Sequence, residues 1–307
     1  MNTQSESKSD NAKRAFVCIH GFGSGPDVSE PGFSSALRDN VRKALGGEEI
    51  VWEEVFWGDL LESPPTDSLL EFMRRVPEMV RKFYKSAEGR AIRERVGEAV
   101  GAASRKAGGT SVTLVGHSFG AAIAYETIAR RKAPEAKGIV MLAPPMGLFN
   151  NPREFLFEVK EKGIACRGLA TALGLGRKPP EEAVFPKVKG NRLPSSVSAV
   201  SWRCIDDLFA MGLEPDFYEV SELRVNLPKG VRGSGKHRFY WRSPRVAKSV
   251  AAMSVSSSVM VSGSSKFLPT LSGREWELMS VSIQESLFKP PRPIYDRHGN
   301  EVGWELV

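Results

Sequence analysis

The sequence predicts one α/β domain with a mostly parallel central sheet and helices on both of its faces. Three observations lead to this fold class. Short apolar runs have the length and the lack of alternation that typify strands buried on both faces. Segments with a helical spacing of apolar residues lie between these runs. The chain has 307 residues, of which 41% are hydrophobic, so it can bury the large core that such a domain needs.

Six segments are candidate strands. The clearest are residues 15–19 and 111–115, which read Ala-Phe-Val-Cys-Ile and Ser-Val-Thr-Leu-Val and carry no charge. A third apolar run covers residues 138–143 and is followed by Pro144 and Pro145, which cannot continue a ladder of hydrogen bonds. The other candidate strands are residues 50–57, 197–203 and 223–227.

Helical patterns alternate with these strands. Phe33, Leu37, Val41 and Leu45 recur every four residues and precede Gly46-Gly47, which predicts a helix and its end. Further helices are expected at 69–83, at 92–100, at 121–131 and after Ser243-Pro244, a pair that suits an N-cap and a first helical residue. Because strands and helices alternate, we expect right-handed crossovers and a parallel sheet.

The chain divides into three parts. Residues 1–13 are polar and predict a disordered tail, and residues 14–252 hold the domain. Within it, residues 148–196 contain no clear strand and are expected to be a cap or loop insertion after the strand at 138–143. Residues 253–307 are a C-terminal extension: 254–273 are rich in serine and predict a linker, and 294–302 predict a hairpin.

Composition excludes several classes of protein. The net charge of +7 comes from lysines and arginines that are scattered along the chain, so we expect a solvated basic surface and no nucleic-acid partner. Weak attraction to anionic lipid headgroups or acidic substrates is the alternative interpretation of this charge. No Cys-x-x-Cys or His-Glu-x-x-His spacing occurs, so neither a metal nor an organic cofactor is expected.

Cysteine usage and apolar segments predict the compartment. The chain has only three cysteines, and a small, odd number argues against a disulfide framework. Cys18 and Cys204 fall in apolar runs, where free thiols pack as small hydrophobes. The N-terminus has no apolar stretch of a secretory signal, and no segment is long and apolar enough to span a bilayer. These features predict a soluble, cytoplasmic protein.

The segment Gly116-His117-Ser118-Phe119-Gly120 is the strongest chemical signal. A Gly-x-Ser-x-Gly match alone is weak evidence, but here a buried strand precedes it and a helix opens directly after it. This context is the one that a nucleophile elbow requires. Its sharp turn raises the serine hydroxyl above the sheet edge, at a helix N-terminus that favours developing negative charge. The other interpretation is a glycine-rich turn with a chance serine.

A second motif, His20-Gly21-Phe22-Gly23, follows the first strand. Together with the Ser118 motif and a late histidine, it gives residues 14–252 a resemblance to the α/β-hydrolase superfamily, especially its esterases and lipases. The resemblance implies an α/β-hydrolase fold and a serine nucleophile, Ser118, that attacks a carbonyl carbon. It also implies an oxyanion hole made by the backbone N–H groups of Phe22 and Phe119.

The family's chain order of nucleophile, acid and histidine narrows the choice of base. Among four histidines, His20 and His117 precede the nucleophile, which leaves His237 and His298. His237 follows a glycine-rich segment and precedes a helix, as the family's base does, so it is the expected general base. His298 lies in the predicted hairpin turn, where a polar residue needs no catalytic role.

The acid should follow the strand at 197–203. Asp206 fits the family's spacing best, and Asp207 is its direct competitor. The remaining alternatives are Asp216, the other aspartate between Ser118 and His237, or a glutamate. Aspartates at such positions also cap helices, so the choice stays open.

The expected reaction is hydrolysis of a small carboxylic ester through an acyl-enzyme. An apolar acyl part is expected because the insertion carries a cluster of apolar residues that suits a pocket or, equally, an anchor to the core: Phe149, Phe155, Leu156 and Phe157. A thioesterase or acyltransferase would use the same triad, and a non-catalytic scaffold that binds a ligand is the alternative from another class.

Overall fold

The computed structural model describes most of the predicted domain and two short strands beyond it. The described residues are 13–22, 31–61, 69–146, 192–204, 207, 210, 220–224, 237–256, 292–295 and 301–305. Most of the predicted insertion, including Phe149, Phe155, Leu156 and Phe157, lies outside them, as do Cys166, Asp206, Asp216 and His298.

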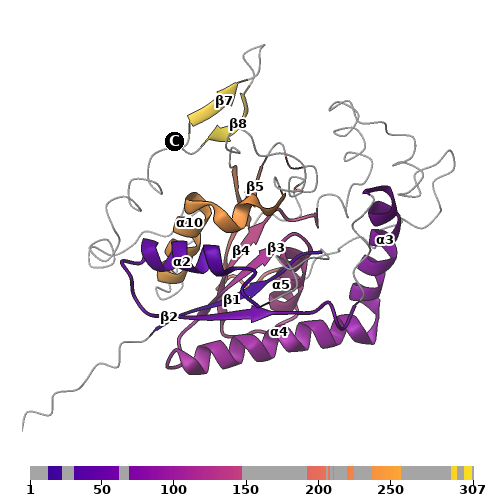
Figure 1. Ribbon diagram of the computed structural model, residues 1–307, viewed down its shortest axis with the longest axis horizontal. Coiled ribbons are helices and arrows are strands. Elements are labelled where there is room, and N and C mark those ends of the chain that lie inside the picture. The colour runs from indigo at the N-terminus through magenta and orange to yellow at the C-terminus, as the bar shows by residue number, and fades with distance from the viewer. Residues whose placement is uncertain are drawn as a thin grey trace, which may run out of the picture.

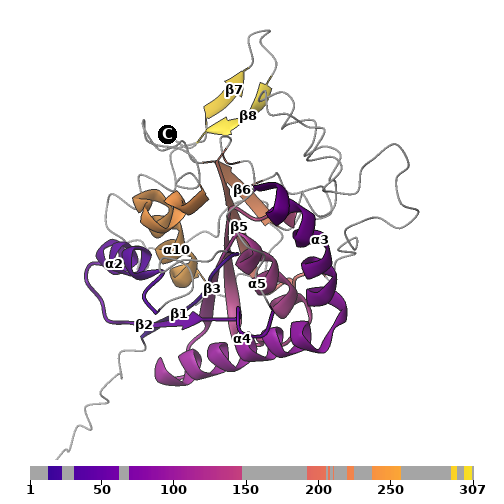
Figure 2. The same cartoon turned by 45° about the vertical axis from the view of Figure 1, so that its right-hand side comes forward.

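A six-stranded sheet forms the centre of the domain, and every neighbouring pair in it is parallel. Its order is β2-β1-β3-β4-β5-β6 (Figure 1; β6 is labelled in Figure 2). The strands are β1 (Arg14–Ile19), β2 (Ile50–Val55), β3 (Val112–His117), β4 (Ala136–Leu142), β5 (Ser198–Arg203) and β6 (Val220–Arg224). The predicted parallel sheet is therefore confirmed. The sixth strand begins three residues earlier than predicted, and β2 ends two residues earlier.

Helices cover both faces of this sheet (Figures 1 and 2). One face carries α3 (Leu69–Lys85), α4 (Ala87–Lys106) and α5 (Phe119–Ala129), and the other carries α2 (Ser35–Ala44) and α10 (Pro244–Ser256). The central strands contribute to both cores. In β1, Val17 and Ile19 belong to the cluster under α4 and α5, whereas Phe16 and Cys18 belong to the cluster under α2 and α10. This alternation between two cores explains why the strand sequences are apolar throughout.

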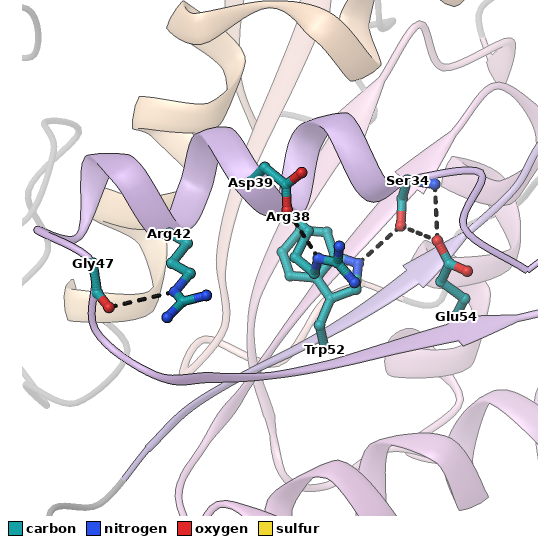
Figure 3. Close-up of polar contacts among 7 residues, drawn as sticks. All are labelled: Ser34, Arg38, Asp39, Arg42, Gly47, Trp52 and Glu54. Carbon is teal, nitrogen blue, oxygen red and sulfur yellow. Dashed lines mark hydrogen bonds and ion pairs between the residues drawn. The ribbon is translucent and has the colours of Figure 1, made fainter.

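A carboxylate from β2 fixes the start of α2 (Figure 3). Glu54 accepts hydrogen bonds from the backbone N–H groups of Gly32 and Ser34 and from the Ser34 hydroxyl, at 2.5–2.8 Å. The Trp52 indole N–H donates to the same hydroxyl at 2.8 Å. The Ser34 hydroxyl makes no cap hydrogen bond to its own helix, and Glu54 satisfies the N–H of this N-cap residue. At the other end, the Arg42 guanidinium donates to the carbonyl of Gly47.

Helix α10 is the last helix of the described residues. Helix α10 begins at Pro244, as expected, but continues to Ser256, so it passes the predicted boundary at 252 and enters the serine-rich segment. Near residues 294–302, where the sequence predicts a hairpin, β7 (Arg292–Tyr295) and β8 (Glu301–Glu305) pair antiparallel in a separate two-stranded sheet. No helix in the described part of the chain combines the length and apolar character needed to cross a membrane.

Candidate active site

The predicted catalytic segments meet where the sheet reverses its strand order. Strands β1 and β3 are neighbours, yet the helices that follow them, α2 and α5, lie on opposite faces. The carboxyl ends of two such strands open a crevice where α/β proteins bind ligands. In this chain the two ends lead directly into His20-Gly21-Phe22 and into Ser118.

Ser118 has the strained backbone of a nucleophile elbow. Its φ of 53° and ψ of −126° lie in a region that residues with a Cβ rarely adopt, at a cost of roughly 1–3 kcal/mol. Its N–H donates to the carbonyl of Leu142 on β4, which ties the turn to the sheet. Ser118 is the N-cap of α5, but its hydroxyl makes no cap hydrogen bond. The hydroxyl therefore does not serve the role that serine usually has at this position.

Close backbone packing explains the two glycines of the motif. A Cβ on Gly116 would overlap the main chain of Gly120 and Ala121, and one on Gly120 would overlap the carbonyl groups of Ile19 and His20. The elbow thus requires hydrogen at both positions, because the turn and the end of β1 pass within contact distance of each other.

The loop after β1 lies directly against the serine. A Cβ on Gly21 would stand 2.6 Å from the Cβ of Ser118 and 3.2 Å from its hydroxyl oxygen. Next to it, the rings of Phe22 and Phe119 stack with centroids 4.2 Å apart. The side chains of the two residues expected to supply the oxyanion hole are therefore in contact, and Phe119 directly follows Ser118.

His20 connects this loop to Trp57, which lies just after β2. Its Nδ1 lies 2.7 Å from the carbonyl oxygen of Gly21, so Nδ1 carries the hydrogen and donates it. Its Nε2 accepts from the backbone N–H of Trp57, whose indole N–H donates in turn to the carbonyl of His20. The imidazole also stacks on the Trp57 ring. Burial lowers the pKa of His20, which keeps this arrangement neutral.

His237 lies beside the elbow and carries a buried carboxylate partner. Its ring centroid is 4.7 Å from that of His117, the residue before Ser118. Its Nδ1 lies 2.8 Å from Oδ2 of Asp207, whose side chain is 2% exposed. The carboxylate that contacts the histidine is therefore that of Asp207, the competitor of Asp206 in the sequence. Cys204 and Asp207 form a tight turn at the end of β5, with the N–H of Asp207 donating to the carbonyl of Cys204.

Tyr240 contacts both ends of that turn, and sequence reasoning missed it. The backbone N–H of Cys204 donates to its hydroxyl oxygen at 2.8 Å, and the hydroxyl also hydrogen-bonds the carboxylate of Asp207. The phenol is fully buried. Burial and then the negative charge of Asp207 raise the pKa of Tyr240, so the phenol stays protonated and donates to the carboxylate. No local pattern reveals this contact, because the partners are 36 residues apart in sequence.

Among the described residues, no group of three or more His, Cys, Asp or Glu side chains is arranged to hold a metal ion. Cys18 and Cys204 are free and buried, as their apolar surroundings in the sequence predicted. The side chains described at the site are those of a serine, three histidines, an aspartate and a tyrosine: Ser118, His20, His117, His237, Asp207 and Tyr240.

Comparison with known proteins gives similarity in structure only. No protein-family model matches the chain, and no curated protein matches its sequence. An esterase from Pyrobaculum calidifontis is 15% identical with a TM-score of 0.43, covering 81% of this chain and 77% of that one. Carboxyl esterase 2 from Tuber melanosporum is 13% identical with a TM-score of 0.43, covering 80% and 77%.

A proline iminopeptidase-related protein from Thermus thermophilus is 15% identical with a TM-score of 0.41, covering 80% of this chain and 90% of that one. The assignment of the fold rests on the chain itself. With its parallel sheet, its helices on both faces and its serine at the turn between β3 and α5, the chain has an α/β-hydrolase fold.

Proposed function

We propose that this chain is a serine hydrolase that cleaves carboxylic esters with Ser118, His237 and Asp207. One observation carries the proposal: the strained Ser118 directly follows His117, whose ring centroid lies 4.7 Å from that of His237, and Nδ1 of His237 faces a buried carboxylate. Local stability does not explain that combination, because the strain costs free energy and the serine hydroxyl caps nothing.

The acid of this proposal is Asp207 and not Asp206. Asp207 is buried, accepts from His237 and receives a second hydrogen bond from Tyr240. An acid in this position holds Nδ1–H of the imidazole, so that Nε2 is the nitrogen that acts as the base. It also stabilises the imidazolium that forms during the reaction.

The proposed mechanism follows from these positions. Nε2 of His237 takes the hydroxyl proton as the Ser118 oxygen bonds to the ester carbon, and the carbonyl electrons move to its oxygen. The N–H groups of Phe22 and Phe119 and the N-terminus of α5 stabilise that oxyanion. The C–O bond then breaks, and the alcohol leaves with the proton from His237. A water oxygen then bonds to the acyl carbon as His237 takes its proton, and the bond from that carbon to the Ser118 oxygen breaks. The serine oxygen regains the proton from His237, and the carboxylic acid leaves.

The proposed substrate is a small ester with an apolar acyl part. Its support in the sequence is the apolar cluster of the predicted insertion, which lies outside the described residues. Acyl esters of increasing chain length test this part of the proposal. A rate of hydrolysis that rises with chain length supports an apolar pocket, and a rate that falls from acetate onward contradicts it.

A fluorophosphonate probe tests the chemistry directly, because it labels only activated serines. The folded protein should be labelled, and Ser118→Ala should abolish the label. Ser201→Ala is the matched control: this serine of β5 is fully buried, and its hydroxyl has no hydrogen-bond partner in the described structure. That variant should label like the parent protein. A folded parent protein that takes no label would contradict the proposal and favour a non-catalytic scaffold.

A further inference from the structure

His117 has no part in the proposed proton transfers, yet it contacts the proposed base. It is the last residue of β3 and is 3% exposed. Its Nε2 lies 2.6 Å from the backbone carbonyl oxygen of His237. Its ring also packs against Trp241, in the helical turn η2 (Phe239–Arg242) that follows His237, with centroids 5.3 Å apart.

The partners of this imidazole fix its protonation. A carbonyl oxygen only accepts, so Nε2 of His117 carries the hydrogen and donates it. Nδ1 is buried, and no hydrogen-bond partner for it exists in the described structure. A second proton there would be a buried donor without an acceptor. Burial, followed by the proximity of His237, lowers the pKa of His117 to about 3. The residue is therefore neutral at neutral pH and does not compete with His237 for the serine proton.

The platform that holds this donor is rigid. Strand β3 pairs with β1 on one side and β4 on the other, and Ser118 is tied to Leu142 by its own N–H. His117 and Ser118 are consecutive residues, so a bond from His117 to His237 sets the base relative to the nucleophile. The Asp207 contact fixes only one atom of the His237 ring, which can still pivot about that atom. A second attachment on the main chain removes this freedom.

We propose that His117 is a positioning residue for the general base. Its Nε2–H holds the backbone of His237, so that the His237 imidazole keeps its position relative to Ser118. The inference rests on the proposed function. His117 exchanges no proton with the substrate and forms no bond to it. Its contribution is geometric, and we expect it to appear in turnover rather than in substrate binding.

Two amide variants separate this role from simple packing. Glutamine places its amide nitrogen where Nε2 of histidine lies, whereas asparagine places it where Nδ1 lies. His117→Gln can therefore keep the donor to His237, and His117→Asn cannot. We expect kcat of the asparagine variant to fall by about tenfold or more, the order expected for one lost buried hydrogen bond, with KM little changed. The glutamine variant should stay within about threefold of the parent enzyme.

The kcat values of the two variants are compared only if both proteins fold, which thermal melting shows. Equal loss of kcat in both variants, or full activity of His117→Asn, would overturn the proposal. If His117→Asn does not fold, the tautomer of His117 in the parent protein tests the proposal instead. In long-range ¹H–¹⁵N spectra of the parent protein labelled at histidine nitrogen, the signals that His117→Gln removes should show a proton on Nε2 and none on Nδ1.

A proton on Nδ1 of His117 would overturn the inference. This measurement needs no catalytic activity, so it separates the inference from the proposed function. A parent protein that takes no fluorophosphonate label and hydrolyses no ester would contradict the hydrolase proposal. The spectrum would still show whether His117 donates to His237.

Discussion

Nδ1 of His237 and Oδ2 of Asp207 lie 2.8 Å apart, although the two residues are 30 positions apart in sequence and the carboxylate comes from the turn after β5. The carboxylate is almost completely buried, whereas the imidazole is 17% exposed. A buried carboxylate that faces Nδ1 fixes the hydrogen on that nitrogen and directs the lone pair of Nε2 toward the site.

Replacing Asp207 by asparagine should therefore abolish most of the activity. The amide can present its NH₂ group to Nδ1, which would stabilise the tautomer with the hydrogen on Nε2 and leave no base for Ser118. We expect kcat to fall by roughly 10³- to 10⁴-fold, the loss that this change causes in serine triads. Hydrolysis of a chromogenic short-chain ester measures it. Asp206→Asn is the adjacent control and should retain activity, and a larger loss in Asp206→Asn would give the triad role to Asp206.

Removing the base should have an effect of similar size. His237→Ala is expected to lower kcat by on the order of 10³-fold or more and to slow fluorophosphonate labelling in parallel, because both reactions need the hydroxyl proton removed. His298→Ala removes the other late histidine and should change neither rate by more than about twofold, because the proposal gives His298 no catalytic role. Inactivity of His298→Ala in a folded protein would refute the assignment of His237.

The elbow and the sheet were predictable because their signals are local. A charge-free strand, a Gly-x-Ser-x-Gly turn and a helix follow one another within residues 111–131. The identity of the acid was not predictable from such a pattern. Asp206 and Asp207 are adjacent, and which of them faces His237 depends on where β5 ends and how the Cys204–Asp207 turn closes.

The partners of Tyr240 and His117 were hidden for a related reason. Each contact joins residues from different strands and helices: Tyr240 reaches Cys204, and His117 reaches His237 from 120 residues away. The sequence shows that a tyrosine follows the base, but whether its hydroxyl is buried depends on how η2 packs against α10. Such contacts follow from the packed domain and not from a periodic pattern.

The hydroxyl of Tyr240 should support the acid. Tyr240→Phe removes the group that receives the N–H of Cys204 and donates to Asp207. We expect kcat to fall by about tenfold and the free energy of unfolding to fall by about 1–3 kcal/mol, since a buried N–H loses its acceptor. Kinetics and urea unfolding measure the two effects.

Tyr84→Phe is the matched control for that change. The Tyr84 hydroxyl is buried with no hydrogen-bond partner in the described structure, so its removal should leave activity unchanged and stability equal or higher. If Tyr84→Phe and Tyr240→Phe lost stability equally, the hydrogen bonds of Tyr240 would not be the cause.

Gly21 should tolerate no side chain. In Gly21→Ala the new methyl group would stand 2.6 Å from the Cβ of Ser118 and 2.9 Å from the carbonyl oxygen of His117, so the loop that carries Phe22 must move away from the serine. A shift of about 1 Å at a catalytic site costs on the order of 10²-fold in rate. Gly58→Ala is the control, because a Cβ there would meet nothing within 4 Å. Activity of Gly21→Ala equal to that of Gly58→Ala would show that the loop does not rest on Ser118.

The two buried histidines of the site should make the fold sensitive to acid. His117 has a pKa of about 3 in the folded protein and an ordinary value of 6.5, and burial also lowers the pKa of His20. Below pH 6.5 the unfolded chain binds protons at these positions that the folded chain does not bind. The free energy of unfolding therefore has its full contribution from the neutral, buried histidines above pH 6.5 and loses it as the pH falls toward 3.

His117→Gln isolates the contribution of one of these groups. It keeps the donor to His237 but cannot titrate. Between about pH 6 and pH 4, the free energy of unfolding of the parent protein should fall by about 1 kcal/mol more per pH unit than that of the variant, the slope expected for one proton. Urea unfolding at both pH values measures the difference, and carboxylates that titrate in this range cancel because both proteins contain them. Parallel stability curves would mean that His117 binds its proton in the folded state as readily as in the unfolded state, and a donor-only role beside His237 would then be untenable.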